Sequence, residues 1–319
     1  MNTSVTQTAA RPEARPRANR SLWARLNKNK LMYLMILPGL IYFLIFKYLP
    51  MWGLVIAFQN YQPFLGIRGS EWVGFEHFER LFNEPTFWML FRNTITLFIL
   101  NLVFYFPVPI ILALMLNEVR VKFFQRTVQT LIYIPHFMSW AIIVSLTYVM
   151  FTTQGGLINE WLASMGFQKI SFLTEEAWFR PLYVMQVIWR EAGWGTIIYL
   201  AAIAAVDVQL YEAARMDGAG RFRQLWHVTL PAIRSTIIVL LILKVGDILE
   251  LGFDHIFLML NGANREVAEI FDTYVYTAGL RQGQFSYSAA VGFFKAAVGL
   301  VMIVFANKLA KRYGEEGIY

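Results

Sequence analysis

The sequence predicts an all-α membrane protein built from six transmembrane helices. Of its 319 residues, 57% are hydrophobic and only 15% are charged, and the mean hydropathy is +0.47, which does not fit a water-soluble domain of this length. A helix needs about 20 mainly apolar residues to cross roughly 30 Å of hydrocarbon. The chain holds six runs of that kind, at 31–49, 93–116, 128–151, 182–205, 235–258 and 287–306.

Each apolar run is expected to be helical, because lipid offers the backbone no hydrogen-bonding partner outside the segment itself. The six-helix domain is therefore predicted over residues 31–307. Residues 1–30 are polar, rich in Arg and Pro, and lack the apolar core of a signal peptide, so they are predicted to form a disordered cytoplasmic tail. Residues 308–319 are predicted to be a second, short cytoplasmic tail.

The distribution of Lys and Arg predicts the side of the membrane that each connection occupies, since basic residues are retained in the cytoplasm. With six spans, 17 basic residues fall on one side and 7 on the other. The richer side holds both termini and the connections after the second and fourth spans, so these are predicted to be cytoplasmic. The net charge of +7 then reflects topology and contact with anionic lipid, and no nucleic-acid partner is expected.

Several kinds of chemistry are absent from the sequence. The chain has no cysteine, which excludes disulfides and thiol catalysis. Its four histidines lie far apart, with no spacing typical of a metal site. No Gly-x-x-x-x-Gly-Lys-[Ser/Thr] stretch is present to cradle ATP phosphates. The sequence therefore predicts a protein that is not an enzyme and that holds no cofactor or metal itself.

The most informative segment is the connection 207–231, between the fourth and fifth runs. Asp207 can cap a short helix that ends near Met216, and Gly218 then allows the chain to reverse. A second short helix would run back to the membrane and stop at Pro231. Such a helical hairpin suits docking into a groove of another protein. A plain connection between two spans would also satisfy the pattern.

Three short motifs in this segment have a specific spacing: Glu212-Ala213-Ala214, Asp217-Gly218-Ala219 and Leu230-Pro231. Together they resemble the EAA loop of the permease subunits of binding-protein-dependent ABC importers. Residues 74–78 and 85–94 look like the first outer loop and second-span entry of the carbohydrate subgroup. Residues 272–276, 289–295 and 314–317 look like its oligo- and polysaccharide branch, which includes alginate importers. The resemblance covers about 31–319, although the residues around Val206 and Trp226 match less closely.

The resemblance implies a type I ABC importer permease fold with a cytoplasmic coupling helix, in the inner membrane of a bacterium. The coupling helix would sit in a cleft of an ATPase subunit, where Glu212 would face a basic group and Ala213 and Ala214 would pack closely. Asp217 and Gly218 would fix the turn. ATP-driven closure of the ATPase subunits would then switch the spans between inward-open and outward-open states.

The resemblance also implies partners. They are a second homologous permease, two ABC ATPase subunits that bind ATP and Mg, an extracytoplasmic solute-binding protein, membrane lipid and a saccharide substrate.

A set of charged residues inside the apolar runs is the candidate substrate path. On a continuous helix at 100° per residue, Lys244, Asp247, Glu250 and Asp254 would share one arc of about 120°. Charged side chains are costly in hydrocarbon and normally face a bundle interior or a wet cavity. The predicted path residues are Arg190, Lys244, Asp247, Glu250 and Lys295. Buried ion pairs that hold the bundle together explain the same residues equally well.

The sequence thus predicts the permease subunit of an ATP-driven importer for oligo- or polysaccharides. Two other classes remain open: an ion-coupled secondary transporter that uses Asp247 and Glu250 as carriers, and an intramembrane enzyme that processes polysaccharide. The docking loop favours the importer, because neither alternative needs one. The mixture of acidic and basic path residues leaves both neutral and acidic saccharides open.

Overall fold

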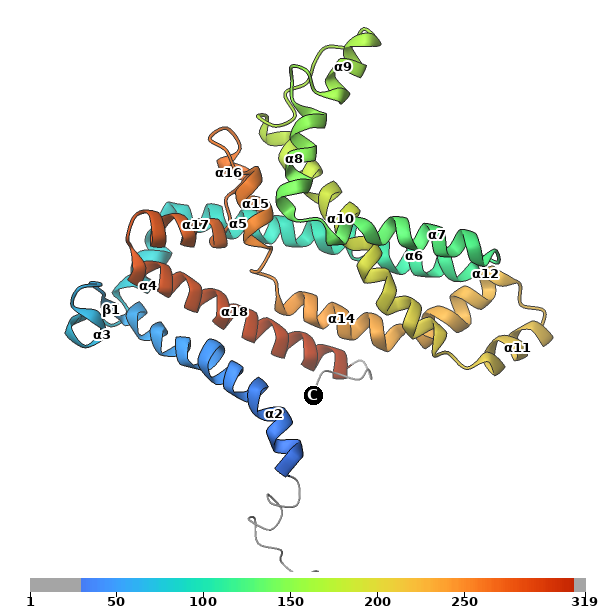
Figure 1. The fold of residues 1–319 in the computed structure, drawn as a ribbon, viewed down its shortest axis with the longest axis horizontal. Coiled ribbons are helices and arrows are strands. Elements are labelled where there is room, and N and C mark those ends of the chain that lie inside the picture. The colour runs from blue at the N-terminus through green and yellow to red at the C-terminus, as the bar shows by residue number, and fades with distance from the viewer. Residues whose placement is uncertain (1–29, 313–319) are drawn as a thin grey trace, which may run out of the picture. The chain divides into compact units, whose positions relative to one another are not determined.

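The computed structural model describes residues 30–312, which are mostly helical (Figure 1). Most of the predicted tails, residues 1–29 and 313–319, lies outside the described residues. The described parts of the predicted tails are helical: Lys30 begins α2, and residues 308–312 are the last turn of α18. The chain divides into two compact units, one up to Leu54 and one from Val55 onward. The first unit is helical from its first described residue. Its elements are α2 (Lys30–Phe43), the π-helical turn η1 (Leu44–Tyr48) and most of the 3₁₀ stretch η2 (Leu49–Phe58).

Three helical stretches of the described chain are long and apolar enough to cross a membrane, and the number rises to six when each of three bent pairs is counted as one span. The three are Lys30–Phe58, Pro85–Glu118 and Phe285–Arg312. They contain the first, second and sixth predicted runs. The predicted number of six spans is reached only when the two helices of each bent pair are counted as a single span.

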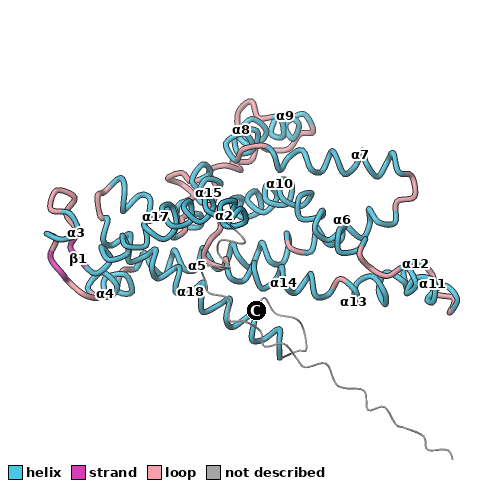
Figure 2. Tube along the Cα trace, turned by 60° about the horizontal axis from the view of Figure 1, so that its bottom comes forward, coloured by secondary structure: helices cyan, strands magenta, loops and turns pink. Residues whose placement is uncertain are grey.

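The second unit is organised around long helices that run side by side (Figures 1 and 2). Helix α6 packs along α10, and α14 packs along α18. Helix α7 and the turn η4 pack on α10 from another side. The bounds are α5 (Pro85–Leu100), η3 (Asn101–Tyr105), α6 (Pro107–Glu118), α7 (Lys122–Tyr133), η4 (Ile134–Phe137), α10 (Glu176–Ala204), α14 (Arg234–Gly246) and α18 (Phe285–Arg312).

Shorter elements connect the long helices. A two-stranded antiparallel sheet pairs Gln59 with Trp72 and Asn60 with Glu71. The remaining elements are β1 (Gln59–Asn60), α3 (Gly66–Gly69), β2 (Glu71–Trp72), α4 (Glu76–Asn83), α8 (Trp140–Phe151), α9 (Leu157–Ser164), α11 (Val208–Met216), α12 (Arg221–Gln224), η5 (Leu225–Thr229), α13 (Leu230–Ala232), α15 (Phe253–Met259), α16 (Arg265–Ala268), α17 (Phe271–Tyr276) and η6 (Thr277–Arg281).

The third predicted run, 128–151, is not one helix. Its first part lies in α7 and η4, and α8 then leaves at an angle of 100° (Figure 1). The bend follows Pro135, and Ser139 starts the new helix by accepting a hydrogen bond from the backbone N–H of Ile142 at 3.4 Å. A single apolar stretch therefore contains a helix stop and a helix start.

The fifth predicted run, 235–258, is also interrupted. Helix α14 ends at Gly246 and α15 begins only at Phe253. Gly252 adopts a φ of 90°, a conformation that favours glycine and cannot continue a right-handed helix. The prediction that Lys244, Asp247, Glu250 and Asp254 share one face of a continuous helix is therefore wrong, because the helix ends before three of them.

Close packing between α7 and α10 depends on one glycine. A Cβ atom on Gly193 would lie 1.9 Å from the carbonyl oxygen of Ile132. No side chain fits in that space, so a glycine at this position lets the two backbones touch. One hydrophobic core cluster includes Tyr183 and Val187 of α10, together with Ile256 of α15.

Candidate functional site

The connection 207–231 folds as a compact helical hairpin, called here the EAA hairpin. The carboxylate of Asp207 accepts a hydrogen bond from the backbone N–H of Gln209 at 2.9 Å and so caps α11. Gly218 has a φ of 75°, and the N–H of Ala219 donates to the carbonyl of Ala214 at 2.8 Å. This is the left-handed C-terminal cap that a glycine permits.

The second half of the EAA hairpin differs from the prediction. Its helical run does not stop at Pro231 but extends from Arg221 through Ala232, and it meets α14 at a bend of 56°. Proline is tolerated there because it occupies the first turn of α13. The hydroxyls of Tyr211 and Thr229 lie 2.9 Å apart and join the two halves.

The EAA hairpin presents an exposed surface. Glu212, Ala213, Asp217 and Gly218 are exposed, and Ala214 is half-buried. Large apolar side chains are exposed beside them, with Met216 at 89% and Phe222 at 79% of their full exposure. Because Glu212 and Met216 are four residues apart on α11, they share one face of the helix. An acidic group next to unburied apolar side chains is typical of a docking surface.

A polar cavity of about 580 Å³ lies between the EAA hairpin and the turn after α6. Its basic lining residues are Arg120, Lys122, Arg215 and Arg221. The guanidinium of Arg221 lies 3.7 Å from the carboxylate of Glu118, so the hairpin and the turn are held together partly by charge.

The predicted substrate-path residues do not form one site. Asp247, Glu250 and Lys295 line a single cavity of about 320 Å³ between α14 and α18, so the structure brings these three together. The ammonium of Lys295 also pairs with the carboxylate of Asp272 on α17. One basic and two acidic groups therefore meet at the break in the fifth run.

The other two predicted path residues lie elsewhere. Lys244 lines a separate cavity of about 190 Å³, where its ammonium is 5.9 Å from the ring centroid of Tyr105. Arg190 pairs with the neighbouring carboxylate of Glu191 and donates from Nε to the carbonyl of Met138 at 3.0 Å. Its guanidinium also lies over the ring of Trp140 at 4.5 Å. Arg190 thus fastens α10 to the start of α8.

A stack of rings continues from Trp140 and was not predicted. The ring of His255 is stacked on Trp140 at 3.8 Å and on Tyr183 at 4.8 Å. Its Nε2 atom is hydrogen-bonded to Oε1 of Gln186 at 2.5 Å. These residues come from α8, α10 and α15, which lie far apart in the sequence. No local pattern in the chain could have indicated the stack.

A charged cluster joins α4, the residue between α4 and α5, α17 and α18. The Nε of Arg80 donates to Glu84 at 2.7 Å, and the hydroxyls of Tyr274 and Tyr287 donate to the same carboxylate at 3.2 and 3.0 Å. Burial by itself raises the pKa of Glu84, but the hydrogen bonds from Arg80 and Tyr287 outweigh burial and hold that pKa below its ordinary range.

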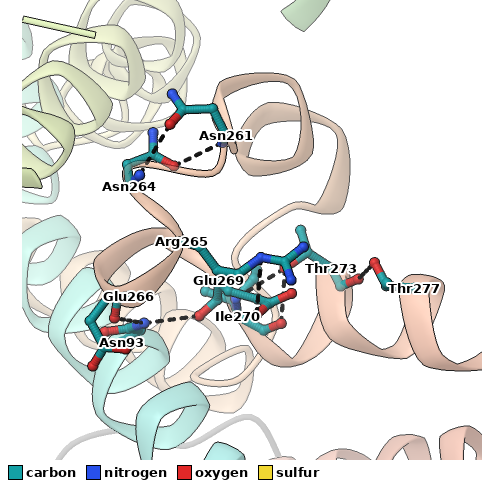
Figure 3. Close-up of polar contacts among 9 residues, drawn as sticks. All are labelled: Asn93, Asn261, Asn264, Arg265, Glu266, Glu269, Ile270, Thr273 and Thr277. Atoms are coloured by element: carbon teal, nitrogen blue, oxygen red, sulfur yellow. Dashed lines mark hydrogen bonds and ion pairs between the residues drawn. The ribbon is translucent and has the colours of Figure 1, made fainter. Parts of the chain in front are cut away.

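The loop between α15 and α17 is fastened to α5 (Figure 3). The side-chain amide of Asn93 donates to the carbonyls of Glu266 and Glu269 at 2.9 and 3.1 Å. The backbone N–H of Ile270 donates to the hydroxyl of Thr273 at 3.0 Å and starts α17. Burial raises the pKa of the Glu269 carboxyl, and Arg265 at 3.8 Å only partly opposes this.

Known proteins resemble this chain over most of its length. The family described as "Binding-protein-dependent transport system inner membrane component" matches residues 105–315. The Bacillus subtilis (strain 168) polygalacturonan/rhamnogalacturonan transport system permease protein YteP is 71% identical over 298 residues, which are 93% of each chain. Protein LplB of the same organism is 58% identical over 94% of each chain.

Two solved structures are similar in fold. A chain from the crystal structure of a bacterial alginate ABC transporter, in complex with an alginate pentasaccharide-bound periplasmic protein, gives a TM-score of 0.86 at 41% sequence identity. The similarity covers 93% of the present chain and 99% of that chain. A second structure, of a transporter involved in the import of the acidic polysaccharide alginate, gives a TM-score of 0.84 at 43% identity over 91% and 98% of the two chains.

Proposed function

Because this chain belongs to the family of inner-membrane components of binding-protein-dependent transport systems, we propose that it is the permease subunit of an ATP-driven importer for oligo- or polysaccharides. The family is one of transport permeases rather than enzymes. The observation that carries the proposal is the EAA hairpin, which offers a carboxylate, small residues and unburied apolar side chains on one exposed surface.

The proposed role of the EAA hairpin is to couple the spans to a separate ATPase. Glu212 would pair with a basic group of the ATPase subunit, while Ala213 and Ala214 allow close approach. Asp217 and Gly218 keep the turn in shape, as the left-handed φ of Gly218 supports. The helical run that ends at Ala232 continues into α14 after a bend of 56°, and this connection is a route by which movement of the hairpin would reach the fifth run.

The proposed assembly contains this chain, a second homologous permease, two ATPase subunits that bind ATP and Mg, and an extracytoplasmic solute-binding protein. The solved relative was crystallised with a saccharide-bound periplasmic protein, which supports the last of these partners. In this arrangement both termini and the EAA hairpin lie in the cytoplasm, in keeping with the excess of Lys and Arg on that side.

The proposed transport path runs past the break in the fifth run. Interrupted helices in transporters free backbone groups to contact a solute near the middle of the membrane. Asp247, Glu250 and Lys295 line the cavity beside this break and supply polar groups there. Lys244 and Arg190 have aromatic and carboxylate neighbours of their own and do not line this cavity.

Uptake into vesicles tests the proposal. The reconstituted complex should take up oligogalacturonate with ATP and binding protein present, and an imposed ion gradient without ATP should drive none. Glu212→Lys should insert normally but lose most ATP-driven uptake, because the substitution reverses the charge at the docking surface. Glu76→Lys is the matched control, since Glu76 is also exposed but lies on α4. Gradient-driven uptake, or normal uptake by Glu212→Lys, would contradict the proposal.

A further inference from the structure

An arginine rests on a cluster of aromatic rings at a place that the proposed transport path does not include. Phe253 and Phe257 of α15 stack at 4.8 Å between ring centroids. The ring of Tyr276, at the end of α17, lies 5.1 Å from each of them. The guanidinium carbon of Arg281 lies 5.5 Å from the Phe257 centroid and 5.4 Å from the Tyr276 centroid.

This cluster lies on the side of the second unit away from the EAA hairpin, as both views show through the positions of α15 and α17 relative to α11 (Figures 1 and 2). With the orientation proposed above, it faces the compartment from which substrate arrives. Its rings are half-buried, and Arg281 is exposed. The cluster is therefore accessible from outside while its rings are held by their neighbours.

The charge of Arg281 is not neutralised within residues 30–312, where no carboxylate forms an ion pair with it. Other basic side chains of the same region do have carboxylate partners: Arg92 pairs with Glu266 at 2.9 Å, and Lys295 pairs with Asp272. Cation–π contacts with the faces of two rings hold the guanidinium of Arg281 in place. Such a contact leaves N–H groups at the edge of the guanidinium free to donate to an anion.

We propose that Arg281, Phe257 and Tyr276 form a subsite for a uronate residue of an incoming acidic saccharide. The fork of guanidinium N–H groups matches the two oxygens of a carboxylate. The exposed parts of the half-buried rings, beside the guanidinium, offer an apolar surface to the C–H groups of the sugar. A neutral saccharide would use only the rings, so the arginine selects the acidic substrate. This inference rests on the proposed function, because it assumes that the chain handles saccharides.

The test measures binding of trigalacturonate to the assembled transporter without its solute-binding protein, by isothermal titration calorimetry, with neutral galactotriose as the second probe. Arg281→Gln should weaken trigalacturonate binding by at least about tenfold, since a hydrogen bond to a charged group is lost. Arg281→Lys keeps the charge and should weaken it less. Arg68→Gln, which removes an exposed arginine from α3, should leave binding unchanged.

Phe257→Leu provides a second probe of the same subsite, because it removes a ring without changing charge. It should weaken the binding of both saccharides, whereas Arg281→Gln should remove only the preference for the acidic one. Equal affinity of the wild-type complex for both probes, or unchanged trigalacturonate binding in Arg281→Gln, would overturn the subsite. Uptake is measured separately, with the same transporter reconstituted in vesicles and supplied with ATP and the solute-binding protein. Loss of all saccharide uptake in the wild type would overturn the proposed function, while the binding data still decide the subsite.

Discussion

Replacing Gly193 with alanine should separate α7 from α10. The new Cβ would lie 1.9 Å from the carbonyl oxygen of Ile132 and 2.5 Å from its carbonyl carbon. Real Cβ atoms essentially never approach another heavy atom closer than 3.0 Å, so the contact has to open by about 1 Å or more. Both contacted atoms belong to the backbone, and neither can move away by a simple change of rotamer. Overpacking of this kind costs about 1–3 kcal/mol.

The assay measures thermal unfolding of the purified complex in detergent, and the quantity monitored is the fraction of protein that remains folded. For a domain of this size the expected cost lowers the melting temperature by roughly 2–10 °C. Gly292→Ala on α18 is the matched control, because a Cβ there would meet nothing within 4 Å. Alanine is about 1 kcal/mol better than glycine inside a helix, so the control should melt at or above the wild-type temperature. Equal melting temperatures for the two variants would refute the close approach of α7 and α10.

Two further predictions concern the turn of the EAA hairpin and the buried carboxyl of the α15–α17 loop. Gly218→Ala should lower substrate-stimulated ATP hydrolysis by the assembled transporter, because the φ of 75° costs an alanine roughly 1–2 kcal/mol; Gly220→Ala, where φ is ordinary, should not. Glu269→Gln should flatten the pH dependence of the melting temperature. Burial raises the folded-state pKa of Glu269 above its ordinary 4.5, so the wild type loses stability as pH rises through that pKa, and the variant should not. Glu266→Gln removes an exposed carboxylate of the same loop and is the matched control, with the wild-type pH dependence expected.

The apolar runs of the sequence predict which segments lie in the membrane, and this determines how much of the fold could be predicted. Hydrophobicity indicates that a segment lies in lipid, and the six runs overlap the three long helices and the three bent pairs that satisfy length and composition. It does not report where a helix stops inside a run. The stop at Pro135 was visible in the chain, but the break before Gly252 depends on a left-handed backbone conformation that glycine permits without requiring it.

In the candidate site, too, some features could be predicted from local sequence and others could not. The geometry of the EAA hairpin could be read from local signals, because Asp207 caps α11 and Gly218 ends it through bonds within a few residues. The charged residues of the fifth run could not be placed this way, since their relative angles assumed an unbroken helix. The rings around His255 and around Arg281 are brought together by packing between elements distant in sequence, which no local pattern records.

The central claim is that the EAA hairpin lies in the cytoplasm against an ATPase subunit. The chain has no cysteine, so Met216→Cys on the exposed face of α11 creates a single thiol, and the side chain there is 89% exposed. Its labelling by a membrane-impermeant maleimide should occur in inside-out vesicles, be absent in right-side-out vesicles, and fall when the ATPase subunits are bound. Labelling in right-side-out vesicles, or labelling that the ATPase leaves unchanged, would contradict the claim.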